Sequence, residues 1–332
     1  MDIYIKSFNR PYLLHRTLLS ICYFLKNFDG KIIVLDDGTP QRYLNKILEL
    51  FPDIQIAKSP FYSQKSKEIL ENRIPPKKIP ADFWRNQIAK GTEQIILLED
   101  DMWFSRPIDF PAFREKAVSE NMDMIKFFWL KNNDLLSERI VSKNEFFSVV
   151  LPKLLVKNAT LFNMIFRTNK LKFGSLASRF VKIDKEILKY YHLYTVAGGV
   201  FSKKYYLTCW NLNQEKVDEM VQIHQLLKSK IPMNVGNTNI EILKATYKTT
   251  ASLISKESLD FEINIFEINR ILNDAWLEGK SYKIDDFGED LPTEWIKSCF
   301  EKNDSPTKTT FEDWSKWYEI FKKSYERMGC SL

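Results

Sequence analysis

Short apolar runs and amphipathic segments alternate through the first hundred residues. Four apolar runs, each long enough for one buried β-strand, occur at 2–6, 31–35, 54–57 and 94–98. Apolar residues at helical spacing predict three helices, at 11–27, 41–50 and 81–90. A stretch rich in Lys and Pro at 63–80 predicts a loop. Strands and helices that alternate in this way predict a mainly parallel sheet flanked by helices, as in Rossmann-like α/β folds.

The pattern becomes less regular after residue 100. An apolar run at 122–130 predicts another buried strand, and the run at 193–201 predicts a strand that contains two adjacent glycines. A helix is expected at 214–227, and another at the end of the sequence, at 311–327. No internal repeat is visible in the sequence.

One segment differs from the rest in charge. Between positions 143 and 190, ten Lys or Arg residues stand against three Asp or Glu residues, among many large apolar side chains. We therefore expect an α/β domain over 1–250 that carries a basic insertion at 134–190. The remaining residues, 251–332, are expected to form a mainly helical C-terminal extension.

Three clusters of polar residues follow the first, second and fourth predicted strands, at 7–10, 36–38 and 99–101. In open α/β sheets, ligands bind beyond the carboxyl ends of the strands. Because parallel strands bring these ends to one edge, the three clusters are expected to meet there. The sequence therefore predicts a single site at this edge.

The third cluster consists of three consecutive acids, Glu99, Asp100 and Asp101. Carboxylates at positions i and i+2 can meet one hard divalent cation, and Mg²⁺ and Mn²⁺ prefer oxygen ligands. Such a cation neutralises charge that develops on a diphosphate leaving group. The competing interpretation is a polar loop that only ends the strand.

The sequence LEDDM at 98–102 resembles the DxD motif of GT-A glycosyltransferases, in the Glu-Asp-Asp form of the N-acetylglucosaminyltransferases that act on N-glycan cores. The sequences IYIKSFNRPYLLHRTLLSI and VLDDGT resemble the inverting family 2 of these enzymes. The resemblance covers 1–110 well and 190–230 loosely. The chain departs from it at Glu99, where the family usually has Asp, and it has no clear counterpart of the acceptor-side Glu-Asp pair.

This resemblance implies a GT-A fold and a role for each matching residue. Asp101, with Glu99, would hold Mn²⁺ or Mg²⁺, and Asp100 would face the nucleotide sugar. The remaining residues implied in nucleotide or donor binding are Ser7, Phe8, Asn9, Arg10, Asp37, Gly38, Arg85, Asn86, Gly198 and Gly199. For Gly198 and Gly199, a tight packing site is an equally good interpretation.

An inverting transferase also needs a carboxylate that takes the proton of the acceptor hydroxyl. Asp218 and Glu219 are the nearest candidates after the Gly-Gly strand, although a solvated helix face explains them as well. His224 fits a late metal ligand less well than a partly buried histidine.

Composition constrains location and partners. The chain has 332 residues, a net charge of +6 and four widely spaced cysteines, which indicates reduced thiols and a cytoplasmic protein. Neither a signal peptide nor a membrane-spanning run is recognisable. Trp314, Trp317, Phe321 and Tyr325 recur near helical spacing and predict either a face that packs on the core or peripheral attachment to an anionic membrane.

These observations favour a metal-dependent glycosyltransferase. It would move a sugar from a nucleotide diphosphate, with UDP favoured, to a glycan or lipid-linked acceptor in bacterial surface polysaccharide synthesis, with inversion at the transferred sugar. A sugar nucleotidyltransferase is an alternative, but the loop SFNRPY lacks the glycines such enzymes use for phosphate. The other alternative is a non-catalytic nucleotide-sugar-binding protein. No nucleic-acid-binding module is recognisable.

Overall fold

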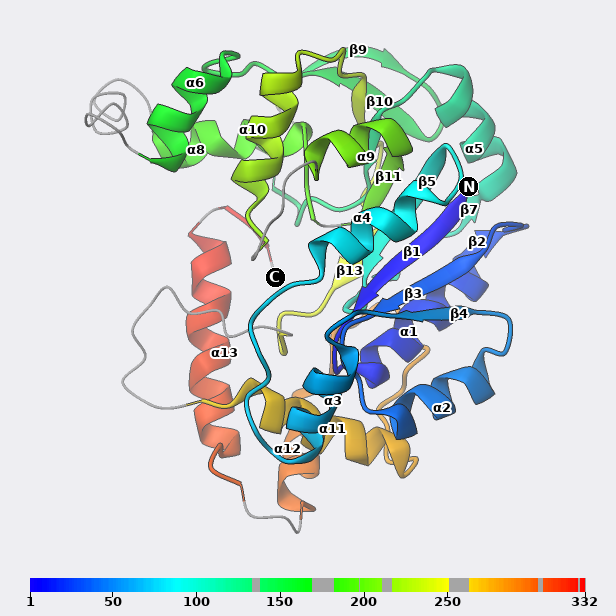
Figure 1. Ribbon diagram of the computed structural model, residues 1–332, viewed down its shortest axis with the longest axis vertical. Coiled ribbons are helices and arrows are strands. Elements are labelled where there is room, and N and C mark those ends of the chain that lie inside the picture. Colours follow the sequence, from blue (N-terminus) through cyan, green and yellow to red (C-terminus); the bar gives the residue numbers. More distant parts are fainter. Residues whose placement is uncertain are drawn as a thin grey trace.

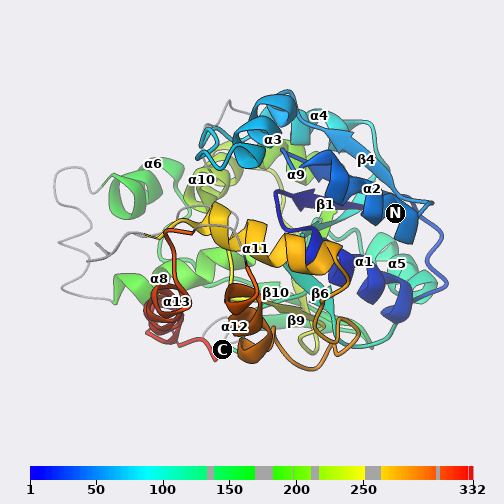
Figure 2. The same cartoon turned by 90° about the horizontal axis from the view of Figure 1, so that it is seen from below.

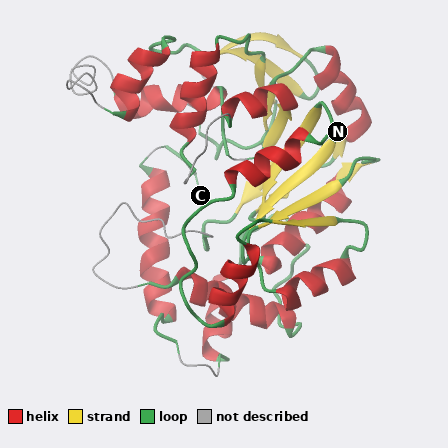
Figure 3. Ribbon diagram, viewed as in Figure 1, coloured by secondary structure: helices red, strands yellow, loops and turns green. Residues whose placement is uncertain are grey.

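The computed structural model describes eight stretches of the chain: residues 1–132, 138–168, 182–196, 198–210, 217–250, 263–303, 307–327 and 329–331. Within these stretches, nine strands form one central sheet in the order β4-β3-β1-β5-β11-β8-β12-β10-β9. Helices cover both faces of this sheet (Figures 1 and 3). The expectation of an α/β fold with a central sheet is therefore confirmed.

The first half of the sheet is parallel and follows the predicted order. Its elements are β1 (Asp2–Ser7), α1 (Pro11–Phe24), β3 (Ile32–Asp36), α2 (Gln41–Leu50), β4 (Gln55–Lys58), α4 (Ala81–Ala89) and β5 (Gln94–Glu99). Their bounds agree with the sequence prediction to within a few residues. The predicted loop at 63–80 was partly wrong, because it holds α3 (Tyr62–Leu70), whose inner face buries Lys65 and Ile69. The charge of Lys65 hid this helix from the hydrophobic pattern.

The second half of the sheet mixes directions. Its strands are β8 (Met124–Lys126), β9 (Arg139–Lys143), β10 (Phe147–Leu151), β11 (Gly199–Ser202) and β12 (Val235–Thr238). Of the strands described, only β11 and β10 run against the others. β8 and β11 are shorter than predicted from the runs at 122–130 and 193–201, because the apolar residues that flank them pack in loops instead.

The segment predicted as a basic insertion contributes to the sheet itself. β9 and β10 extend the sheet at its edge, and α6 (Ala159–Phe162), η2 (Asn163–Arg167), α8 (Ile183–Leu188) and η4 (Lys189–His192) follow. Residues 134–137 and 169–181 of this insertion lie outside the described stretches. Two small pairings complete the strands: β2 (Leu25–Lys26) with β7 (Ile108–Asp109), and β6 (Met102–Phe104) with β13 (Leu243–Ala245).

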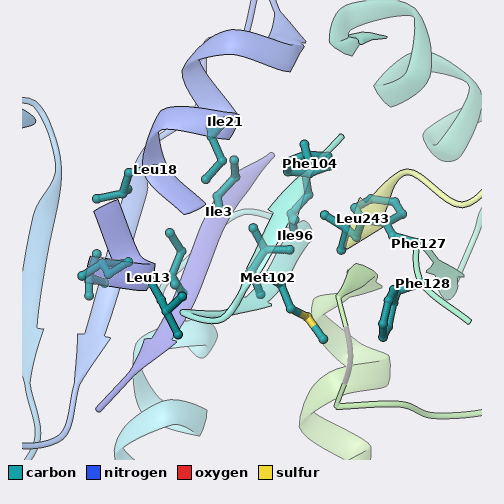
Figure 4. Close-up of a cluster of buried hydrophobic side chains, with 14 of the residues drawn as sticks. Ile3, Leu13, Leu18, Ile21, Ile96, Met102, Phe104, Phe127, Phe128 and Leu243 are labelled. Atoms are coloured by element: carbon teal, nitrogen blue, oxygen red, sulfur yellow. The ribbon is translucent and has the colours of Figure 1, made fainter. Parts of the chain in front are cut away.

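Two apolar cores lie on opposite faces of the sheet. One is shared by α1, α2, α5 (Phe110–Ser119), α11 (Ile265–Leu277), α12 (Thr293–Glu301) and α13 (Phe311–Glu326). Figure 4 shows part of this core, with Leu13, Leu18 and Ile21 of α1 near Ile3 and Ile96 of the sheet. The other core lies under α4, α9 (Lys203–Cys209) and α10 (Glu219–Ser229). Figure 2 shows α11 beside α1, on the side of the sheet away from α4 and α9.

The described part of the predicted C-terminal extension belongs to the first core. Trp314 and Trp317 of α13 are buried there, and Trp314 Nε1 donates a hydrogen bond of 2.8 Å to the carbonyl of Lys248. Arg16 of α1 is buried and donates to the carbonyls of Asp286 and Glu289. Trp314 and Trp317 of the aromatic stripe therefore pack in the core as predicted, whereas Phe321 and Tyr325 are only partly buried. Within the described stretches, no helix combines the length and apolar character needed to cross a bilayer.

Candidate functional site

A cavity of about 590 Å³ opens at the carboxyl ends of β1, β5 and β8. Its lining includes residues from all three predicted clusters: Ser7, Phe8 and Arg10, then Asp37, then the acidic triplet. The turn after each strand puts these groups at one edge of the sheet, because β3, β1 and β5 are parallel neighbours. Their predicted convergence is confirmed.

Asp100 is held inside the protein by β1 and the loop that follows it. Its backbone N–H donates to the Lys6 carbonyl at 3.0 Å, and its Oδ2 accepts from the Phe8 N–H at 3.0 Å. Arg10 Nη2 donates to the other oxygen, Oδ1. Burial raises the pKa of Asp100 to about 6, although the charge of Arg10 acts in the opposite direction. With both oxygens engaged, Asp100 fixes the geometry of the triplet.

Asp101 is arranged differently. Its Oδ2 accepts a hydrogen bond of 2.7 Å from Arg10 Nη1, whereas its Oδ1 is buried without a hydrogen-bond partner. The side chain of the neighbouring Glu99 forms no hydrogen bond or ion pair with the rest of the described chain, and burial followed by the charge of Asp101 raises its pKa to about 7. The two carboxylates therefore repel each other at the wall of the cavity.

These two carboxylates fit a hard divalent cation. Asp101 Oδ1 and Glu99 could supply two oxygen ligands, and the remaining positions would go to water and substrate phosphates, as Mg²⁺ sites commonly arrange them. Over the described stretches, no three His, Cys, Asp or Glu side chains gather into a complete ligand set. His224 is not part of the lining.

Asp37 lies in a second corner of the cavity and already has partners. Ser59 Oγ donates to its Oδ1 at 2.5 Å, and Lys65 Nζ of α3 donates to its Oδ2. The same ammonium lies 5.0 Å from the centroid of the Phe8 ring. Gly38 is required here, because it has a φ of 139° and a Cβ at its position would lie 2.5 Å from the Lys65 Cβ.

The two candidate bases are separated by the start of α10. Asp218 is the N-cap residue and accepts a hydrogen bond of 3.1 Å from the Met220 N–H, and it does not line the cavity. Glu219 lines the cavity and accepts a hydrogen bond of 2.7 Å from the Val196 N–H. Burial raises the pKa of Glu219 above its ordinary value.

Several residues implied by the resemblance do not line the cavity. Asn9 is buried, and its carbonyl and side-chain oxygens accept from Asn273 Nδ2 of α11, each at 3.1 Å. Arg85 and Asn86 lie on α4, which presents Trp84 to the cavity instead. A Cβ on Gly198 would lie 2.2 Å from Leu243 Cδ1, and a Cβ on Gly199 would lie 2.6 Å from the Ile125 carbonyl oxygen. Both glycines therefore have a packing role.

The cavity also contains residues that sequence reasoning missed. Lys6 and Lys126 line it from the ends of β1 and β8, and Lys65 lines it from α3. Lys6 ends an apolar run and Lys126 interrupts one, which is a weak signal for a buried charge, whereas Lys65 lies in a polar stretch that gives no such signal. The aromatic part of the lining comes from seven distant segments and includes Phe8, Trp84, Phe128, Trp129, Tyr191, Tyr247, Phe266, Phe321 and Tyr325.

Comparisons with known proteins give distant structural matches. No family model and no curated protein sequence matches the chain. Residues 1–349 of TarS from S. aureus match with 10% identity over 98% of this chain and 81% of that chain, with a TM-score of 0.41. Glucosyl-3-phosphoglycerate synthase from Mycobacterium tuberculosis, in complex with Mg²⁺ and uridine diphosphate, matches with 10% identity over 74% and 70%, with a TM-score of 0.39.

A third match is the galactosyltransferase LgtC, in complex with donor and acceptor sugar analogues. It has 10% identity over 68% of this chain and 70% of that chain, with a TM-score of 0.35. At these identities and TM-scores, the likeness assigns no activity to this chain. The chemistry of the site therefore depends on its own residues.

Proposed function

We propose that this chain is a GT-A-type glycosyltransferase that moves a sugar from a nucleotide diphosphate to an acceptor hydroxyl. The observation that carries the proposal is one shared cavity. Phe8 and Asp37 offer a ring face and an acceptor for a nucleoside, Glu99 and Asp101 offer oxygens for a cation, and Glu219 offers a separate buried carboxylate. A sugar transferase needs these three parts within reach of one substrate pair.

UDP is the nucleotide that best fits the corner at Asp37. The carboxylate of Asp37 is an acceptor, and the ammonium of Lys65 beside it is a donor. The uracil ring presents an N–H next to carbonyl oxygens, so it matches this acceptor–donor pair. The Phe8 ring, 5.0 Å from Lys65 Nζ, provides an apolar face beside the pair.

Mn²⁺ or Mg²⁺ would be held by Asp101 Oδ1 and Glu99. When bound, the cation would neutralise the charge that develops on the diphosphate. Arg10 holds the other oxygen of Asp101 at 2.7 Å, so the free oxygen of Asp101 has a fixed orientation. Asp100, held by the backbone of Phe8, keeps Arg10 in place.

Glu219 is proposed as the general base. It takes the proton of the acceptor hydroxyl while that oxygen bonds to the anomeric carbon and the carbon–oxygen bond to the diphosphate breaks. Attack opposite the leaving group inverts the anomeric carbon. Burial raises the pKa of Glu219, and a base works best with a pKa near the operating pH.

A glycan or lipid-linked saccharide of a bacterial surface polysaccharide is the proposed acceptor. Trp129, Tyr191, Phe321 and Tyr325 line the cavity and give apolar faces against which sugar rings can pack. Trp314 and Trp317, which a membrane anchor would need, are buried in the core, so these side chains are not available for peripheral attachment to a membrane.

Thermal shift with nucleotides and their sugars, with and without Mn²⁺, tests the donor site. UDP with Mn²⁺ is expected to raise Tm more than UDP alone. Asp101→Asn should abolish both the Mn²⁺-dependent part of the Tm increase and the hydrolysis of UDP-sugars. The matched variant Asp218→Asn should retain both. Metal-dependent hydrolysis that survives in Asp101→Asn would overturn the mechanism.

The base is tested separately. Glu219→Gln should keep the affinity for UDP but lower the transfer rate by about 100-fold or more, the usual contribution of a positioned base. An unchanged rate would remove Glu219 from the mechanism and leave the donor site intact.

A non-catalytic nucleotide-binding protein is the second candidate, because Arg10 already pairs with both Asp100 and Asp101. If the guanidinium replaces the cation, UDP should stabilise the protein equally with and without Mn²⁺. In that case no donor sugar would be hydrolysed.

A further inference from the structure

Two lysines of the cavity have no role in the proposed transfer. Lys6 is the penultimate residue of β1 and is 6% exposed, and Lys126 is the last residue of β8 and is 5% exposed. Both line the cavity. Ammonium groups are costly to bury unless something compensates their charge, so two of them at one cavity need an explanation.

Lys6 is held in place by aromatic rings rather than by hydrogen bonds. Its Nζ lies 4.5 Å from the centroid of the Trp84 ring and 5.1 Å from that of the Trp210 ring. This buried Nζ has no hydrogen-bond partner. Cation–π contacts fix the position of an ammonium but leave its three N–H donors unused.

Lys126 is arranged in the same way. Its Nζ lies 5.7 Å from the centroid of the Tyr191 ring and forms no ion pair within the described chain. Gly199 of β11 is its partner in the sheet and adds no side chain beside it. Burial lowers the pKa of Lys126 to about 8, while the charges of Glu219, Cys330 and Glu241 act in the opposite direction.

The acidic neighbours of these lysines are engaged elsewhere. Glu219 accepts from the Val196 N–H and, in the proposed mechanism, must stay free for the acceptor proton. Glu99 is the sheet partner of Lys6 and is assigned to the cation. Neither acid makes an ion pair with Lys6 or Lys126, so no acid of the described chain neutralises either of these two cavity-lining lysines by direct contact.

We infer that Lys6 and Lys126 form an anion subsite that binds a carboxylate or phosphate group carried by one of the two sugar substrates. The identity of the substrates in this inference rests on the proposed function. The existence of the subsite does not. A charge-assisted hydrogen bond from either lysine replaces hydration that the cavity removes. The enzyme would then select acidic or phosphorylated saccharides over neutral ones.

Isothermal titration of the full chain with matched pairs of probes tests the subsite. UDP-glucuronate against UDP-glucose, with Mn²⁺, examines the donor sugar. Glycerol 3-phosphate against glycerol, with and without UDP, examines the acceptor. In at least one pair, the charged probe should bind about tenfold tighter or more, the effect of one or two charge-assisted hydrogen bonds.

Three variants assign the effect to residues. Lys126→Met and Lys6→Met replace the apolar stem of lysine by one of similar length and remove the ammonium group, and each should reduce the preference for the charged probe towards onefold. Lys77→Met is the matched control, because Lys77 also lines the cavity but is exposed, and it should keep the preference. If Lys6→Met fails to fold, the result for Lys126→Met alone decides whether the subsite exists.

Each outcome separates this inference from the proposed function. Equal affinity for charged and neutral members of both pairs, with UDP still bound, overturns the subsite and leaves the transferase intact. A preference that persists in Lys126→Met also overturns it. Phosphate-dependent binding that is lost in Lys126→Met, without any binding of UDP, supports the subsite and removes the proposed donor.

Discussion

Arg10 and Asp100 form a buried ion pair beneath the cavity, with side chains that are 5% and 1% exposed. The second guanidinium nitrogen of Arg10 pairs with Asp101, so one arginine orients two of the three acids. A buried pair contributes little net stability compared with apolar residues, but the loss of one partner leaves a buried charge uncompensated. The arrangement is therefore sensitive to any change at Arg10.

Arg10→Met should lower the free energy of unfolding by about 3–5 kcal/mol, the usual cost of breaking a buried pair. Arg42→Met is the matched control, because Arg42 and Asp274 pair with side chains that are 50% and 32% exposed. An exposed pair is worth about 1 kcal/mol or less. Urea unfolding of both variants measures their free energies of unfolding. Equal losses of stability in the two variants would contradict the assignment of Arg10 to a buried ion pair.

Glu99→Gln should change how stability depends on pH. Burial raises the pKa of Glu99 from 4.5 to about 7. The folded protein therefore binds this proton more strongly than the unfolded chain does, and the contribution of Glu99 to stability falls as pH rises through that window. We expect Glu99→Gln to be more stable than the parent protein at pH 8 and less different from it at pH 5.

Urea midpoints at several pH values check this prediction. Glu49→Gln, at an exposed position of α2, should leave the pH dependence unchanged. A parallel decline of the parent protein and Glu99→Gln between pH 5 and 8 would show that Glu99 is not the titrating group.

Much of the fold follows from local sequence, and much of the site does not. β1, β3, β5 and α1 are visible as apolar runs and helical spacing. The acidic triplet was recognisable because it follows such a run. The resemblance gave Asp100 and Asp101 different roles, but the contacts that distinguish them come from Phe8 and Arg10, which are distant in sequence, so these contacts are visible only in the folded geometry.

The missed residues share a physical reason. Lys65 of α3 and Lys126 of β8 are buried by segments that lie far away in the chain, and a lysine in a local pattern predicts solvent. The direction of β11 was also hidden, because four residues do not specify parallel or antiparallel pairing. Its Gly199 looked like an approach point for a sugar, although its hydrogen atoms are needed for strand packing.

Gly199→Ala should therefore destabilise the sheet. The added Cβ would lie 2.6 Å from the backbone oxygen of Ile125, which cannot move without β8. Overpacking of this kind costs about 1–3 kcal/mol. Gly288→Ala is the control, because its Cβ would lie 3.5 Å from the nearest atom, Asp286 Oδ1, at ordinary contact distance. Thermal unfolding of both variants compares them, and a Gly199→Ala protein as stable as Gly288→Ala would contradict the packing role.

His15 should make the link between α1 and α11 sensitive to acid. Its Nδ1 accepts a hydrogen bond of 3.1 Å from Trp276 Nε1, and burial followed by the charge of Lys46 lowers its pKa to about 4. Because the folded state keeps His15 neutral, its contribution to stability is complete above pH 6.5 and declines as pH falls towards 4. His15→Phe should lose less stability than the parent protein between pH 6.5 and 4 in urea titrations, and an equal loss would count against this role.

The contact between Tyr12 and Thr249 has a consequence for synthesis. Their hydroxyl groups are 3.1 Å apart, although 237 positions of chain separate them. At a translation rate of about 5–20 residues per second, roughly 12–47 s pass between the two residues. During that time the apolar face of α1 lacks part of its final cover, so we expect the nascent chain to depend on chaperones until α11 has docked.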